Sequence, residues 1–208
     1  MASLMSQNQH NQVLLAQQGS YTEESAQWIS HELYDTLTFP STATTMNFFQ
    51  TPVSGTKSFA KTNMKQSGQL PVNQKFRFFQ VEISALLKPT GSLADHDLAA
   101  EAFLEVIQNS WFQFVIDGRE YDLQFNGASL LPTLGYVGAL SSAVSAGRFT
   151  SKGTYRLGAK INLGALTSFG LNVNFDPGAN VVTQLGVLST RTTELQVRLA
   201  GELFRKIA

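Results

Sequence analysis

The chain has 208 residues, 43% of them hydrophobic and 14% charged, and its 15 Lys and Arg residues balance its 15 Asp and Glu residues. It contains no cysteine, which excludes disulfide bonds, thiolate metal sites and a cysteine nucleophile. A surface with few charges and no net charge does little to keep molecules apart, so we expect the protein to associate with copies of itself.

The N-terminal segment 1–43 is predicted to be an arm. Its first 20 residues are rich in Gln and Asn and contain no Lys, Arg, Asp or Glu, which is typical of an extended or weakly helical tail. They lack the basic and apolar regions of a signal peptide, so we expect the product to stay in the cytoplasm where it is made. A short helix is predicted over residues 21–35, where Trp28, Ile29 and Leu33 share one helical face.

Strand patterns dominate from residue 44 onward. Residues 46–51 form a short apolar run, and residues 75–87 alternate between apolar and polar side chains until the pattern slips by one step after Phe78. A slip within a long strand predicts a β-bulge. Residues 91–109 then carry apolar side chains at helical spacing and give the clearest predicted helix.

A β-hairpin is predicted over residues 111–125, which read WFQFVIDGREYDLQF. Asp117 and Gly118 are expected to form a two-residue type I′ turn, because Asp-Gly tolerates the positive φ angles that this turn requires. A two-residue turn fixes the pairing of the two strands. The predicted pairs are Ile116 with Arg119, Val115 with Glu120, Phe114 with Tyr121, Gln113 with Asp122, Phe112 with Leu123 and Trp111 with Gln124.

The remaining sequence is rich in glycine and predicts long loops between short strands. Short strands are expected at residues 154–157, 160–163, 170–175, 193–199 and 203–207, with a turn at Asp176-Pro177-Gly178. Seven or eight strands with one inserted helix and long connections indicate a mainly β fold. We therefore predict a single jelly-roll β-sandwich or barrel over residues 44–208, preceded by the extended arm.

No predicted metal or cofactor site emerges from the titratable residues. The histidines, His10, His31 and His96, lack the spacing of metal ligands. Asp95, His96 and Asp97 form one local cluster, but three consecutive residues of a helix point in different directions. The cluster is interpreted as a solvated helix start.

A catalytic role is also not predicted. Glu120 and Asp122 fall on one strand face two residues apart, as the paired carboxylates of a glycoside hydrolase could. The solvent-exposed face of any hairpin can carry two acidic residues at this spacing without a catalytic role. Since no known catalytic motif occurs elsewhere, we expect no enzymatic activity.

The charge pattern argues against a specific nucleic-acid site. Residues 1–56 contain four acidic residues and no basic one, and Lys57 is the first base. Phosphate binding draws its affinity from Lys and Arg, so the arm is not predicted to bind nucleic acid. The run Phe76, Arg77, Phe78 and Phe79 could stack on bases, but a core strand explains it more simply. The uncharged first 20 residues of the arm either dock along a neighbour's sheet edge or form a disordered linker.

Two segments resemble jelly-roll capsid proteins of small icosahedral bacteriophages. They are TNMKQSGQLPVNQKFRFFQVEIS, residues 62–84, and ELQVRLAGELFRKI, residues 194–207. The resemblance lies in a polar loop closing before a long aromatic strand, an Asp-Gly hairpin after a helix, and a final alternating strand. It implies a capsid subunit of the virion that assembles through its loops and arm into an icosahedral shell.

The resemblance also implies the partners of such a subunit. These would be copies of itself and other virion proteins, with an internal lipid layer or the genome as further contacts. Many shell proteins have a basic arm, and this chain departs from that pattern. It is therefore left open whether the inner surface of the shell would contact the genome or a lipid layer.

Two rival functions fit the same strand pattern. One is a carbohydrate-binding or other ligand-binding β-sandwich module, in which Trp28 or Trp111 would stack on a sugar. The other is a β-sandwich enzyme that uses Glu120 and Asp122.

Overall fold

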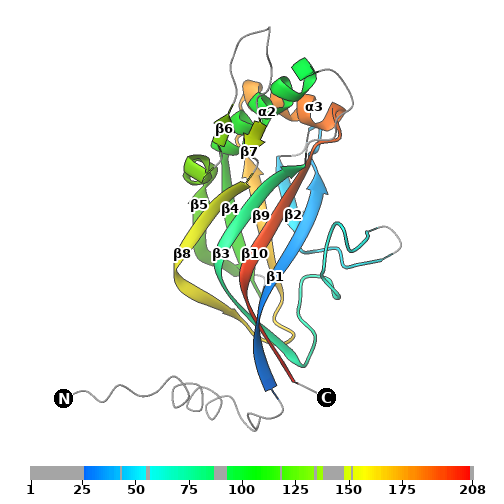
Figure 1. The fold of residues 1–208 in the computed structure, drawn as a ribbon, viewed down its shortest axis with the longest axis vertical. Coiled ribbons are helices and arrows are strands. Elements are labelled where there is room, and N and C mark those ends of the chain that lie inside the picture. Colours follow the sequence, from blue (N-terminus) through cyan, green and yellow to red (C-terminus); the bar gives the residue numbers. More distant parts are fainter. Residues whose placement is uncertain are drawn as a thin grey trace, which may run out of the picture.

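Within the described residues the fold is mainly β, with two four-stranded antiparallel sheets packed face to face and two α-helices at one end (Figure 1). The structure is a computed structural model, and it describes residues 26–42, 44–54, 57–86, 93–117, 119–133, 135–137, 148–150 and 152–206. The prediction of a β-sandwich with an inserted helix is confirmed at this level.

Sheet A consists of four long strands in the order β1-β10-β3-β8. Their bounds are β1 (Ala26–Thr38), β10 (Glu194–Lys206), β3 (Gln74–Leu86) and β8 (Lys152–Leu163). Sheet B has shorter strands in the order β2-β9-β4-β5. Their bounds are β2 (Thr45–Phe48), β9 (Phe169–Phe175), β4 (Ser110–Ile116) and β5 (Arg119–Asn126). A small third sheet pairs β6 (Gly135–Val137) with β7 (Arg148–Thr150).

The strand pairing is nested along the chain. Among the eight strands of the two large sheets, the first pairs with the last, as β1 with β10, and the second with the next to last, as β2 with β9. The third pairs with the sixth, as β3 with β8, and the two in the middle, β4 and β5, form the hairpin.

Phenylalanine side chains fill the space between the sheets. Phe78 of β3 and Phe114 of β4 come from opposite sheets, and their ring centroids lie 5.1 Å apart. Phe112 and Phe125 stack within sheet B, and Tyr155 of sheet A stacks on Phe125. Since alternate strand residues point to one face, these rings are buried while their sequence neighbours form the outer faces.

The predicted helix over residues 21–35 is wrong where the structure describes it, because Ala26 to Thr38 form strand β1. Every residue of β1 pairs with a residue of β10, so long-range pairing overrides the helical pattern. Ile29 and Leu33 point toward the core, whereas Trp28 lies on the opposite face against Phe204. Sheet A therefore extends back into the segment that the sequence assigned to the arm, whose residues 1–25 lie outside the described part.

The expectation that only one helix is inserted between the strands is also wrong. The predicted helix is confirmed as α2 (Leu93–Gln108), but a second helix, α3 (Ala179–Thr190), follows the turn at Asp176 and packs against α2. Its buried residues Val181, Leu185 and Leu188 have helical spacing. This helix was not predicted from the sequence because its β-branched residues and Gly186 lower the helix propensity of the segment. A 3-10 helix, η2 (Gly127–Thr133), covers the end of β5.

Two strands are longer than predicted. Residues 154–157 and 160–163 belong to one strand, β8, whose pairing with β3 skips the residues around Gly158. Residues 193–199 and 203–207 belong to β10, which runs through Gly201 with a register shift. The predicted bulge in β3 is confirmed by the register shift between Phe78 and Gln80.

The Asp-Gly hairpin is confirmed, and Asp117 has a φ of 50°. Its register is correct only next to the turn, where Ile116 pairs with Arg119 and Val115 with Glu120. An irregularity between Gln113 and Val115 then shifts the pairing by two residues. The observed outer pairs are Gln113 with Gln124, Phe112 with Phe125 and Trp111 with Asn126.

Candidate functional site

The segment between β2 and β3, residues 49–73, lies along the edge of sheet A formed by β1. Asn63 acts as a substitute strand partner there. Its Oδ1 accepts the backbone N–H of Tyr34 at 3.0 Å, and its Nδ2 donates to the carbonyl oxygen of Glu32 at 2.6 Å. The hydroxyl of Thr62 donates to the carbonyl oxygen of Tyr34 at 3.2 Å. This segment therefore covers part of an edge that would otherwise be open to strand addition.

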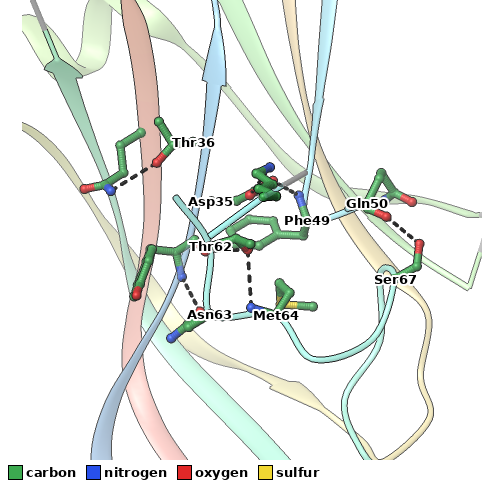
Figure 2. A network of polar contacts seen from close by, with 11 residues as sticks. Asp35, Thr36, Phe49, Gln50, Thr62, Asn63, Met64 and Ser67 are labelled. Carbon is green, nitrogen blue, oxygen red and sulfur yellow. Dashed lines mark hydrogen bonds and ion pairs between the residues drawn. The ribbon is translucent and has the colours of Figure 1, made fainter. Parts of the chain in front are cut away.

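A buried ion pair holds this segment in place, and its carboxylate, Asp35, belongs to the polar network drawn in Figure 2. Asp35 is fully buried on the same face of β1 as Leu33, and its Oδ1 pairs with Nζ of Lys57, which is only 8% exposed. Its Oδ2 accepts the backbone N–H of Phe49 at 2.7 Å. Charges this deeply buried remain ionised only when paired and hydrogen-bonded.

The ion pair is linked to both sheets through Phe49, which follows β2. Phe49 has a φ of 70°, a left-handed conformation that is costly for a bulky residue. Its carbonyl oxygen accepts the N–H of Gly68 at 2.8 Å, and the carbonyl oxygen of Gly68 accepts the N–H of Phe169 at 2.6 Å. Hydrogen bonds thus run from Asp35 in sheet A to the start of β9 in sheet B.

A pocket of about 340 Å³ lies between sheet A and this segment. Sheet A contributes Ile29, His31, Leu33, Gln74 and Leu203, and the segment contributes Met64, Leu70 and five others. Three exposed apolar side chains surround it: Phe59 lines the pocket, Val72 follows its lining residue Pro71, and Leu166 donates its backbone N–H to Leu70. The described lining contains no carboxylate and no hydroxyl group, and its ionisable side chains are His31 and Lys65.

The acidic residues and the histidine that were weighed as catalytic or metal-binding candidates have side chains outside the described residues. Glu120 and Asp122 lie in β5, and the backbone of Glu120 pairs with that of Val115, but their side chains lie outside the described part. Asp95, His96 and Asp97 lie in the first turns of α2, with side chains likewise outside it. Within the described residues, no group of three His, Asp or Glu residues could hold a metal ion.

The run of residues 76–79 forms part of the core, as expected. Phe76 and Phe78 are buried between the sheets, and Phe79 is 39% exposed at the bulge. Arg77 points to the outer face of sheet A, where its guanidinium lies 4.1 Å from the centroid of Trp28. Trp28 therefore contacts both the guanidinium of Arg77 and the ring of Phe204.

Trp111 is the more accessible of the two tryptophans considered for sugar stacking. It lies on the outer face of sheet B with 43% of its surface exposed. His31 lines the pocket and meets the ring of Phe76 edge-on.

An acidic residue on the outer face of sheet A has a perturbed ionisation. Burial alone would raise the pKa of Glu202, but its hydrogen bond to Nε of Arg77, the charge of Arg77 and the nearby Lys160 together hold this pKa below its ordinary value. Folding therefore favours the ionised carboxylate.

We expect Glu202→Gln to lower the free energy of unfolding slightly at neutral pH. A depressed folded-state pKa contributes stability above the unfolded pKa, near 4.3, and this stability is lost as the pH falls through the folded pKa. The effect should be small and weakened by salt, because the side chain is partly exposed. Urea unfolding of wild type and variant between pH 7 and about pH 3 measures it. A difference that stays constant across this range would contradict the assignment.

Comparisons with known proteins add little. No family model and no curated protein matches the chain. Among solved structures, the crystal structure of decameric BFDV capsid protein aligns over 87% of this chain and 95% of that chain, at 7% identity and a TM-score of 0.22. A TM-score this low carries no argument about fold or function. No helix in the described residues is long and apolar enough to span a membrane.

Proposed function

We propose that this protein is a structural subunit of a virion, a jelly roll that assembles with copies of itself into an icosahedral shell. The nested strand pairing carries the proposal. A long antiparallel hairpin pairs its first strand with its last and each inner strand with its counterpart. Rolling the hairpin up distributes these pairs over two sheets, as they are in sheets A and B. Jelly rolls occur in capsid proteins and in lectins, so the surface must distinguish the two.

The exposed apolar side chains support a role in assembly. Phe59, Val72 and Leu166 are more than half exposed around the pocket, and Leu98 of α2 is 52% exposed at the end of the molecule that carries the helices. Leu166 is also held at a φ of 59°, which is uncommon for leucine. Large apolar side chains exposed to solvent, here around the pocket and at the end that carries the helices, are typical of surfaces that contact other proteins. Repetition in a closed shell multiplies each such contact.

The uncharged arm supports the same role. We propose that residues 1–20 dock on a neighbouring subunit, where amide side chains satisfy strand-edge groups as Asn63 does on β1. Other virion proteins are further partners in this proposal. Because the arm offers no cation to phosphates, contact with the genome or an internal lipid layer would fall to other surfaces. The proposed role is structural, without catalysis.

Assembly is tested on the purified full-length chain. We expect light scattering after size exclusion, together with negative-stain microscopy, to show closed particles of uniform size. A monomer that persists to high concentration would overturn the proposal.

Deletion of residues 1–20 is expected to impair assembly without unfolding the sandwich, because the described strands begin at Ala26. The thermal midpoint of the protomer should move by less than about 2 °C, which corresponds to less than about 1 kcal/mol for a domain of this size. Particle formation and thermal melting are measured on the same samples. Unchanged particles would remove the arm from the assembly contacts.

A further inference from the structure

The outer face of sheet B carries two complete rows of neighbouring side chains without any charge. Each row crosses all four strands, and the strand register places its members directly opposite one another. The first row is Thr45, Asn174, Trp111 and Asn126. The second row is Asn47, Asn172, Gln113 and Gln124, in which Gln113 is buried and Asn172 is half-buried. Six of these eight side chains are amides.

Trp111 is the only aromatic residue in the two rows. Its strand neighbour Phe112 and Phe114 beyond it are fully buried on the opposite face, whereas Trp111 is 43% exposed. A strand position on a polar face does not require an indole ring for folding. A broad apolar ring with an N–H at its edge is instead suited to contact a partner that is apolar in one part and polar in another.

The amides around Trp111 provide hydrogen-bonding groups of both kinds. Each amide has an acceptor oxygen and a nitrogen that donates twice. Asn174, directly opposite Trp111, accepts the hydroxyl of Thr45 with Oδ1 at 2.9 Å, and its Nδ2 is buried without a hydrogen-bond partner. Asn126, on the other side of Trp111, accepts the N–H of Ala128 with Oδ1 at 2.8 Å and is exposed. Gln124 and Asn47 are exposed at the two ends of the second row.

These properties select a class of ligand. An apolar protein surface would leave the amides without hydrogen bonds, which is costly on burial. A phosphate or carboxylate ligand would find no cation in the two rows. A neutral sugar has hydroxyl groups that both donate and accept, and its ring presents a face of C–H groups to an indole. Four strands span about 14 Å, which accommodates a short oligosaccharide.

We propose that the outer face of sheet B binds a neutral carbohydrate, with Trp111 stacked on a sugar ring and the exposed amides Asn47, Gln124 and Asn126 bound to its hydroxyl groups. This binding site is independent of shell assembly, since it requires only one subunit. In an assembled particle the repeated sites would strengthen weak individual binding.

The test uses the full-length protein, an array of neutral glycans and low-speed pelleting with cellulose, chitin or insoluble xylan. We expect binding to at least one of these, and we expect Trp111→Ala to weaken it by at least about tenfold. Trp111→Tyr keeps an aromatic ring and should retain part of the affinity. The matched control is Trp28→Phe, which changes the tryptophan on the outer face of sheet A and should bind as the wild type does.

Three outcomes would overturn the proposal. The first is that no neutral glycan or polysaccharide binds. The second is that Trp111→Ala binds as well as the wild type. The third is that Trp111→Ala changes the particle size in light scattering and leaves glycan binding intact, which would assign this face to a contact between copies. Failure of shell assembly alone would leave the carbohydrate site unaffected.

Discussion

Asp35→Asn is expected to destabilise the protein by about 3–5 kcal/mol, the usual cost of removing one partner from a buried ion pair. The substitution leaves the Lys57 ammonium, 8% exposed, without its counter-charge. It also weakens the acceptor that holds the N–H of Phe49 in its left-handed conformation. Urea unfolding monitored by circular dichroism measures the difference.

A control and a double variant separate the ion pair from other causes. Glu32→Gln removes an exposed carboxylate from the same strand, where the pair with Arg198 is 3.6 Å long, and should cost less than about 1 kcal/mol. Adding Lys57→Met to Asp35→Asn should recover much of the lost stability, because no unpaired charge then remains. If Asp35→Asn costs no more than Glu32→Gln, the ion pair does not hold the β2–β3 segment.

This ion pair was not predictable from the sequence, although one signal was available. Asp35 and Lys57 are 22 positions apart and belong to different elements, so no local motif connects them. Once residues 26–38 are known to be a strand, Asp35 falls on the same face as Leu33 and Leu37. A carboxylate on a core-facing position requires a buried partner.

Local signals predicted the elements that depend on neighbouring residues. The Asp-Gly turn, the bulge after Phe78 and helix α2 are each encoded within a short stretch, and the structure confirms all three. The elements that failed depend on distant parts of the chain. Strand β1 exists because it pairs with β10, and α3 forms despite its β-branched residues because it packs against α2.

The candidate carbohydrate face also combines a feature that was predictable from local sequence with features that depend on distant parts of the chain. Trp111 was identified from the sequence as a residue that could stack on a sugar, and its exposure on the outer face agrees with that role. Its neighbours could not be identified, because the irregularity in the β4–β5 pairing replaces Gln124 with Asn126 as its partner. The amides of β2 and β9 required the full sheet order, which no local pattern provides.

Gly201→Ala is expected to cost at least about 2 kcal/mol and to disturb the pairing of β10 with β3. A Cβ atom at this position would lie 2.1 Å from the carbonyl oxygen of Arg77 and 2.7 Å from Cα of Phe78, both backbone atoms of the adjacent strand. Neither backbone atom can move without disturbing the irregular pairing of β10 with β3 at Ala200 and Gly201. Glycine therefore permits two central strands of sheet A to approach closely where β10 is irregular.

Gly158→Ala is the matched control, because Gly158 is exposed in β8 of the same sheet and a Cβ there would have no atom within 4 Å. Its free energy of unfolding should stay within about 0.5 kcal/mol of the wild type. Chemical unfolding of both variants tests the comparison, and amide hydrogen exchange of β10 reports whether its pairing is disturbed. Equal stability of the two variants would contradict this explanation. It would mean that β10 and β3 can move apart at position 201 without a loss of stability, so that their close approach does not require glycine.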